Sequence, residues 1–213
     1  MALDYAAARK NMVDGQVRPN DVTDVAILEA MGEIARERFC PPALHELAYA
    51  ESPVSYAPGL SLMEPRDVAK LLQALFPLPG QKALAIAAPY AAAVMAHIGL
   101  DVTLVSPTRE VEAFYGEALG GLEVRRASGD LKTVGENGPY DQIICEGAVC
   151  RAPQAWLNAV ALGGKLAVVE RDGPVGKAIV YARGHDGVIG RREMFDSTPP
   201  MLPGFERVKH FSF

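Results

Sequence analysis

The middle of the chain alternates short apolar runs with segments of helical character. The apolar runs, which predict strands, cover residues 82–88, 102–106, 122–127, 140–146 and 165–170. The segments that predict helices cover residues 90–98, 108–119 and 153–161. Strands that are apolar throughout and are joined through helices are typical of a parallel sheet covered on both faces. The pattern therefore predicts an α/β fold with a mostly parallel central sheet.

The regions on either side of this core, which spans 81–171, have different patterns. Residues 1–80 predict a helical cap with helices at 4–13, after Asp21 or Thr23, and from Pro65 to Pro77, and with a loop at 51–62. Residues 172–213 predict strands at 178–183, 188–195 and 207–213 with no helix between them, which favours antiparallel pairing. Because no linker separates these regions, we expect one domain over residues 1–213.

Composition and charge exclude several classes of protein. The chain is 49% hydrophobic and 22% charged, as in ordinary globular proteins, and its net charge of −5 with scattered basic residues disfavours nucleic-acid binding. It contains no apolar run long enough for a membrane span and no signal-peptide pattern. Cys40, Cys145 and Cys150 are an odd and sparse set of cysteines, so we expect reduced thiols and a cytoplasmic location. The four histidines have no companion spacing, which argues against a zinc site. The mean hydropathy of +0.07 is compatible with an oligomer.

The turn after the first core strand is where a ligand is expected. In open parallel sheets, ligands bind beyond the carboxyl ends of the strands, where the strand order reverses. A nucleotide-binding turn normally has glycine there, because backbone N–H groups must approach the ligand closely. Here the turn reads Ala87-Ala88-Pro89-Tyr90, and Pro89 removes one N–H donor. The next strand ends in Ser106 instead of an acidic residue, so the sequence predicts a poor nucleotide site.

Several segments, taken in order and spacing, resemble a known family. They are Arg36-Glu37-Arg38-Phe39-Cys40-Pro41, Ala48-Tyr49-Ala50-Glu51, Gly59-Leu60-Ser61-Leu62-Met63-Glu64-Pro65, residues 84–95, Gly129-Asp130-Leu131, residues 139–144 and residues 162–166. Together they resemble the protein-L-isoaspartate O-methyltransferases. The resemblance implies a Rossmann-like methyltransferase fold with an N-terminal helical cap and a modified C-terminal strand order. It also implies transfer of a methyl group from S-adenosylmethionine to an isoaspartyl carboxylate of a damaged protein or peptide.

The resemblance places the substrate loop at Ser61, Met63 and Glu64. Met63 stands where the family has a serine that helps to hold the carboxylate, and a thioether has no hydrogen to donate. Ser61 could partly take over that contact, although a serine in such a loop is more often a turn residue. Glu64 would repel a carboxylate substrate, and its simpler role is that of an acidic residue at the start of the helix from Pro65.

The resemblance places the cofactor at Ala87, Ala88, Tyr90, Ser106, Asp130, Leu131 and Glu146. Asp130 stands where the family contacts the adenine, Leu131 replaces a glycine, and Glu146 is expected to face the cleft from a strand end. Because the glycine-rich turn and the acidic residue at position 106 are both replaced, we predict weak or absent binding of S-adenosylmethionine. Two hypotheses remain: an active isoaspartyl methyltransferase with an unusual site, or an inactive pseudo-methyltransferase that acts as a protein-binding or regulatory module.

Overall fold

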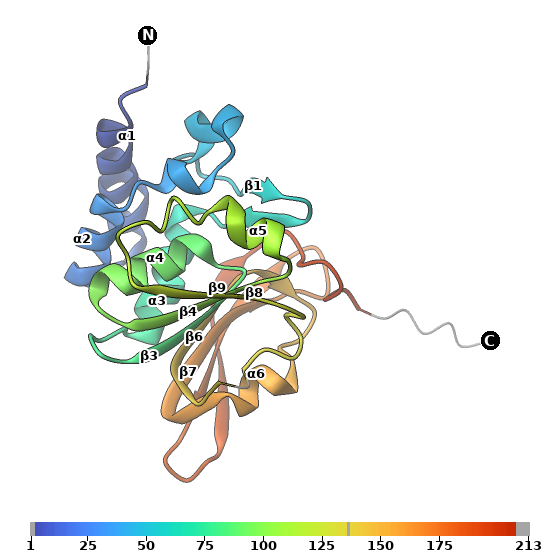
Figure 1. Ribbon diagram of the computed structural model, residues 1–213. Coiled ribbons are helices and arrows are strands. Elements are labelled where there is room, and N and C mark those ends of the chain that lie inside the picture. The colour runs from blue at the N-terminus through green and yellow to red at the C-terminus, as the bar shows by residue number, and fades with distance from the viewer. Residues whose placement is uncertain (1–2, 136, 208–213) are drawn as a thin grey trace.

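A seven-stranded sheet forms the centre of the computed structural model, which describes residues 3–135 and 137–207 (Figure 1). Its strands are β3 (Lys82–Ile86), β4 (Asp101–Ser106), β5 (Val124–Ser128), β6 (Tyr140–Val149), β7 (Val160–Glu170), β8 (Gly176–Arg183) and β9 (Ile189–Ser197). They lie in the order β5-β4-β3-β6-β7-β8-β9, with parallel pairing from β5 to β7 and antiparallel pairing of β8 and β9. The predicted α/β fold, with a mostly parallel sheet and antiparallel C-terminal strands, is confirmed.

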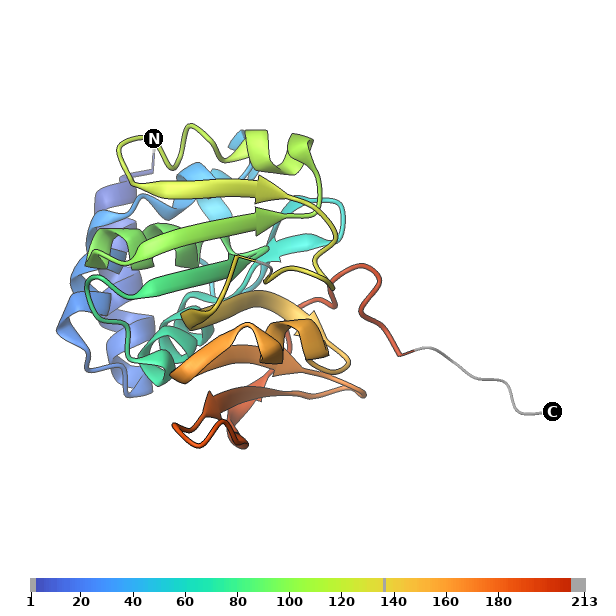
Figure 2. The same cartoon turned by 60° about the horizontal axis from the view of Figure 1, so that its bottom comes forward.

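Helices cover the two faces of this sheet unequally. The α-helices are α1 (Tyr5–Met12), α2 (Val25–Glu33), α3 (Pro65–Leu75), α4 (Pro89–Ile98), α5 (Arg109–Phe114) and α6 (Gln154–Asn158). A π-helical turn (Val13–Val17) continues α1, and 3-10 helices cover Arg18–Asn20, Arg36–Phe39 and Pro42–Leu47. On one face α3 packs against β6 and β7, and α4 packs against β3 and β4. The short α6 lies on the opposite face, in front of the strands in Figure 2.

Several predicted elements differ from the structure. The helix expected over 153–161 ends at Asn158, and β7 begins at Val160 instead of residue 165. Residues 51–62, expected to be a loop, contain a hairpin of β1 (Val54–Ala57) and β2 (Leu60–Leu62), because Gly59 with φ +73° makes the turn between two strands with alternate buried residues. The helix expected over 108–119 ends at Phe114, since three glycines follow within seven residues. The α2 helix is capped by Asp24, whose carboxylate accepts the Ile27 N–H at 3.1 Å. The strand expected at 207–213 lies almost entirely outside the described residues.

The strand order creates a switch point between β3 and β6. From β3 the chain runs outward through β4 to β5 and then returns to the other side of β3 as β6. The carboxyl ends of β3 and β6 therefore meet where the connections diverge, which is where open α/β sheets bind ligands. Ala83 and Ala85 in β3 and the alanines at the start of α4 are fully buried. These small side chains let α4 lie close against the sheet beside the switch point.

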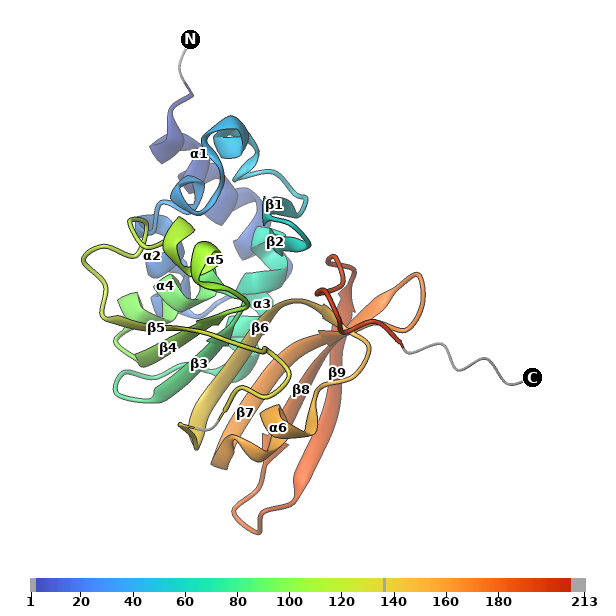
Figure 3. The same ribbon diagram turned by 45° about the vertical axis from the view of Figure 1, so that its right-hand side comes forward.

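Residues 198–205, called the C-terminal segment below, cross back over the carboxyl end of β6 (Figure 3). The Ala148 N–H donates to the Pro200 carbonyl at 2.9 Å, and the Leu202 N–H donates to the Ala148 carbonyl at 2.8 Å. This segment continues to Phe205, which packs on Trp156 with 5.4 Å between ring centroids. The C-terminal segment therefore forms part of the wall at the ligand-binding edge of the sheet.

A buried carboxylate fixes the far side of this edge. Glu170, at the end of β7, accepts the Ala152 N–H at 3.0 Å, the Tyr181 hydroxyl at 2.6 Å and Arg191 Nη2 at 3.0 Å. These contacts tie β7 to β8, to β9 and to the loop after β6. Burial raises the pKa of Glu170, but the hydrogen bonds from Tyr181, Ala152 and Arg191 outweigh it and leave the pKa below its usual value.

Candidate cofactor and substrate site

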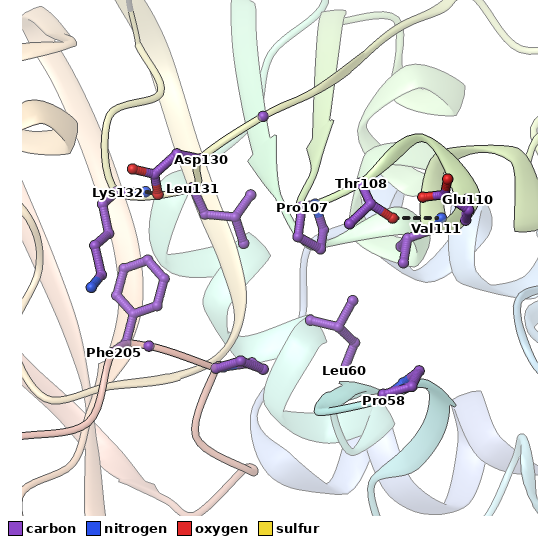
Figure 4. A pocket seen from close by; sticks show the side chains of 13 residues that line it. Pro58, Leu60, Pro107, Thr108, Glu110, Val111, Asp130, Leu131, Lys132 and Phe205 are labelled. Carbon is purple, nitrogen blue, oxygen red and sulfur yellow. Dashed lines mark hydrogen bonds between the residues drawn. The ribbon is translucent and has the colours of Figure 1, made fainter.

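A cavity of about 610 Å³ lies at the carboxyl ends of β4 and β5 (Figure 4). Pro107 and Val111 line one side, and Asp130 and Leu131 line the other. The hairpin and the C-terminal segment also contribute side chains, among them Leu60 and Phe205. We call this the β4–β5 cavity. Its volume and its mostly apolar walls are typical of sites for small molecules or for a few peptide residues.

Of the seven positions that the resemblance assigns to the cofactor, two line the β4–β5 cavity. Asp130 is exposed in its wall and Leu131 forms part of its apolar lining. The other five are at most 2% exposed: Ala87, Ala88, Tyr90, Ser106 and Glu146. Within the described residues, the Ser106 hydroxyl has no hydrogen-bond partner. The structure therefore separates the assigned positions into a cavity wall and a buried cluster.

The turn from Ala87 to Tyr90, called the 87–90 turn below, is closed by the protein itself. Ala87 has φ +47°, a left-handed conformation that favours glycine. Its N–H donates to the Val105 carbonyl at 2.9 Å, and its carbonyl accepts the Tyr56 hydroxyl at 3.2 Å. The backbone at Ala87 thus has a conformation that is usual for glycine. Its N–H and its carbonyl both form hydrogen bonds within the protein, and its methyl group is buried.

Glu146 was expected to face the cleft, but it lies behind the 87–90 turn and is buried there. β6 bulges after Ile144, and Gly147 at φ +121° lets the chain turn Glu146 toward α4. The carboxylate accepts the Met63 N–H at 3.1 Å and the Ala91 N–H, in the first turn of α4, at 3.0 Å. Burial raises the pKa of Glu146, whereas the Arg36 charge and the two backbone N–H groups lower it, and burial has the larger effect.

Arg36 is the cation next to this cluster, and it is fully buried. Its Nε donates to the Ala48 carbonyl at 2.7 Å, and its Nη2 donates to the Met63 carbonyl. The guanidinium carbon lies 4.7 Å from the centre of the Tyr90 ring, which is a cation–π contact. Among the described residues, Arg36 Nη1 and the Tyr90 hydroxyl have no hydrogen-bond partner. Arg36 therefore links the substrate loop to the 87–90 turn.

The substrate-loop positions lie outside the lining of the β4–β5 cavity. Ser61 is half-buried in β2 and pairs with Ser55 across the hairpin, while Met63 is fully buried. Glu64 precedes α3 and forms an ion pair with Arg66, with 3.4 Å between Oε2 and Nε. Burial and then the Asp67 charge raise the pKa of Glu64. The structure brings Met63 and Glu146 together but places Ser61 and Glu64 in separate local contacts.

Sequence reasoning did not single out the residues that complete the cluster and the cavity. Arg36 belongs to a segment that carried the resemblance, but a single arginine beside other charged residues gives no sign of burial. Tyr56 lies in the stretch that was expected to be a loop, and its contact with Ala87 depends on the hairpin. Phe205 lies between two of the expected C-terminal strands, and its place in the cavity wall depends on the path of the C-terminal segment. For Glu146, the apolar residues on both sides of it, 143–145 and 147–149, were a signal in the sequence that could have suggested burial.

The described part of the chain offers no other obvious site chemistry. Within residues 3–135 and 137–207, no group of three His, Cys, Asp or Glu side chains could hold a metal ion. None of the helices in these residues is long and apolar enough to cross a membrane.

A sequence profile described as Protein-L-isoaspartate(D-aspartate) O-methyltransferase (PCMT) matches residues 7–192. The chain belongs to this family. It is 34% identical to the protein-L-isoaspartate O-methyltransferase of Methylorubrum populi over 171 residues, which cover 76% of this chain and 79% of the relative. It is 32% identical to protein-L-isoaspartate O-methyltransferase 1 of Rhodopseudomonas palustris, over 78% of this chain and 70% of the relative. The resemblance found in the sequence is confirmed.

Solved structures of the PCMT family share the fold. A protein-L-isoaspartate O-methyltransferase superimposes with a TM-score of 0.77 at 21% identity and covers 93% of this chain and 67% of its own. A putative family member from Plasmodium falciparum, solved in complex with S-adenosyl-L-homocysteine, also has a TM-score of 0.77, at 16% identity, and covers 94% of this chain and 99% of its own. The Rossmann-like methyltransferase fold is therefore confirmed.

Three backbone positions at or next to the 87–90 turn are not free to donate a hydrogen bond to S-adenosylmethionine. A cofactor at the 87–90 turn needs free backbone N–H groups there. The Ala87 N–H is bonded to Val105, Pro89 has none, and the Ala91 N–H is bonded to Glu146. Ser106, at the ribose position, is fully buried. The N–H groups of Ala88 and Tyr90 are the remaining backbone donors of this turn.

Proposed function

We propose that this chain is a PCMT-family protein that binds a protein or peptide partner without transferring a methyl group from S-adenosylmethionine. The observation that carries the proposal is the closure of the 87–90 turn. The Tyr56 hydroxyl bonds the Ala87 carbonyl, and the Glu146 carboxylate bonds the Ala91 N–H, so both sides of the turn are engaged. Opening the turn would break these bonds and leave the buried Glu146 carboxylate with one backbone donor fewer, which costs about 1–3 kcal/mol.

The β4–β5 cavity supports the binding half of the proposal. Its walls come from four separate segments, and Leu60 and Phe205 provide large side chains. Glu110, Asp130 and Lys132 give it two acidic groups and one basic group. Such a site suits a short peptide segment with apolar side chains and a polar end. We further propose that the protein acts in the cytoplasm, where its three cysteines stay reduced.

The second candidate is methyl transfer to isoaspartyl residues. Membership of the PCMT family favours it, since the relatives named above are protein-L-isoaspartate O-methyltransferases. Asp130 also stands in the wall of a cavity large enough for a small molecule. This candidate requires that the 87–90 turn open to expose backbone donors, and that Ser61 or a backbone group hold the substrate carboxylate in place of Met63.

Calorimetric titration with S-adenosylhomocysteine and S-adenosylmethionine separates the two candidates. The Methylorubrum populi relative serves as the positive control in the same buffer. We expect no saturable binding by this chain up to millimolar ligand, and no methyl transfer to an isoaspartyl peptide. Micromolar binding together with methyl transfer to the isoaspartyl peptide, and not to its aspartyl counterpart, would establish the second candidate and overturn the first.

The partner-binding half has its own measurement. Fluorescence anisotropy of labelled isoaspartyl and aspartyl peptides, with apolar flanking residues, reports binding without any adenosyl ligand. We expect saturable binding that is weakened at least tenfold by Leu131→Asp, which places a charge in the apolar wall. A matched change outside the cavity, Leu162→Asp, lies on an exposed side chain and should leave binding unchanged. Equal affinities for the two variants would refute peptide binding in this cavity.

A further inference from the structure

The Glu146 carboxylate is held as a bound anion would be. Its two oxygens accept from two different segments: Oε2 from the Met63 N–H at 3.1 Å, and Oε1 from the Ala91 N–H at 3.0 Å. Ala91 lies in the first turn of α4, a ten-residue helix, where unpaired N–H groups and the helix dipole favour negative charge. Glu146 itself comes from neither segment but reaches in from β6. The arrangement is therefore a complete two-donor cradle that is filled from a third element.

A buried cation lies near this cradle: the charge of Arg36 lowers the pKa of Glu146, although the structure shows no hydrogen bond or ion pair between the two side chains. Arg36 is 0% exposed and bonds the carbonyl of Met63, the same residue whose N–H binds Glu146. Within the described residues its Nη1 is buried and has no hydrogen-bond partner. A carboxylate that lies at a helix N-terminus and near a guanidinium is in surroundings that favour negative charge. Glu146 is 1% exposed, so bulk solvent does not reach these groups.

We infer that the Met63 N–H, the Ala91 N–H and Arg36 form a carboxylate-binding site that the chain fills with its own Glu146. A small free carboxylate takes this site when the Glu146 side chain is removed. The inference deepens the proposed function, because an internal carboxylate that joins the substrate loop to α4 holds the 87–90 turn closed. An external carboxylate must compete with Glu146 for the same donors.

Chemical rescue tests the inference without any adenosyl ligand. Glu146→Ala removes the carboxylate and leaves space for formate, whereas Glu146→Gln fills the same space with an amide. Thermal unfolding is measured for the wild type and both variants in formate from 0 to 200 mM, with chloride at matched ionic strength. We expect E146A to melt several degrees below the wild type, and formate to restore at least about 3 °C of its Tm in a saturable way. The wild type and E146Q should respond equally to formate and chloride.

A formate response of E146A that is no larger than that of E146Q or the wild type would overturn the inference. If E146A does not fold in chloride, the yield of refolding from urea becomes the readout. Formate must then raise the yield above that in chloride, and equal yields would also overturn the inference. This test is separate from the test of the proposed function. Binding of an adenosyl ligand by the wild type would refute the proposed function but would leave rescue by formate unaffected. The absence of rescue by formate would refute only the inference about Glu146.

Discussion

Replacing Arg36 with methionine should destabilise the protein strongly, because Arg36 joins three segments from inside the core. It donates to the carbonyls of Ala48 and Met63 and lies over the Tyr90 ring. Methionine keeps much of the side-chain volume but donates no hydrogen bond. The variant R36M therefore leaves two buried carbonyls without this donor and removes the cation that partly compensates the Glu146 charge.

The size of the effect follows from these contacts. A hydrogen bond to a charged group contributes about 1.5–3 kcal/mol, and two are lost. The cation–π contact adds about 1 kcal/mol, while relief from burying a charge offsets part of the sum. We expect R36M to lower the free energy of unfolding by about 3–5 kcal/mol, the range seen when one partner of a buried charged pair is removed. For a chain of this length, that corresponds to a Tm lower by roughly 6–20 °C.

Urea unfolding followed by circular dichroism measures this loss, with Arg38→Met as the matched control. Arg38 lies in the same 3-10 helix but is exposed, and its Nη2 makes one bond to the Glu117 carbonyl at 2.9 Å. R38M should lower the unfolding free energy by less than about 1 kcal/mol. Equal losses for R36M and R38M at pH 7 would refute the reasoning.

The loss in R36M should also depend on pH, with a sign set by Glu146. Burial raises the pKa of this carboxyl in the folded protein, and Arg36 opposes the rise, so removing Arg36 raises the pKa further. When the folded pKa exceeds the unfolded value, the folded state binds more protons, and stability falls as pH rises between the two values. The deficit of R36M should therefore be larger at pH 8 than at pH 5, and the double variant R36M/E146Q should lose less than the sum of the single variants. A deficit that does not change with pH would contradict the role given to Glu146.

Three further predictions concern separate sites. Ala87→Gly should change the free energy of unfolding by less than about 1 kcal/mol, because the relief of backbone strain at φ +47° offsets the loss of the buried methyl group. Ala88→Gly, at φ −126°, relieves no such strain and should lower the free energy of unfolding by about 1–2 kcal/mol in the same urea assay. Glu170→Gln should lower the free energy of unfolding by about 2 kcal/mol at pH 7. Because the pKa of Glu170 is lowered in the folded protein, this loss should shrink as the pH falls below the usual glutamate pKa and disappear below the lowered pKa. A loss that stays constant from pH 7 to pH 3 would contradict this. Ellman's reagent at pH 8 should label one thiol of the native protein, that of the half-buried Cys150, and all three thiols in urea. The other two cysteines are buried, and burial raises the pKa of Cys40 to about 11. Fast labelling of more than one thiol in the native protein would contradict the structure.

Most of the fold could be predicted from the sequence, for reasons that act locally. A strand buried on both faces must be apolar throughout, so β3, β4, β6 and β7 were visible as apolar runs. Gly99, at φ +102°, ends α4 where the sequence predicted a stop. The β1–β2 hairpin was missed, because a stretch rich in proline and glycine has no strand pattern apart from the alternate burial of Val54 and Tyr56, which only packing against the rest of the protein reveals.

For the site, the sequence by itself determined which donors and charges are missing: no glycine in the 87–90 turn, no hydroxyl at Met63, and no acid at Ser106. These are properties of side chains that hold in any fold. Only the tertiary structure decided what replaces them, because the carboxylate of Glu146 meets backbone groups of Met63 and Ala91, which are 83 and 55 positions away along the chain. Such contacts depend on the strand order and on a bulge in β6. Because every residue except proline has a backbone N–H, the sequence does not show which of these groups will bind the carboxylate.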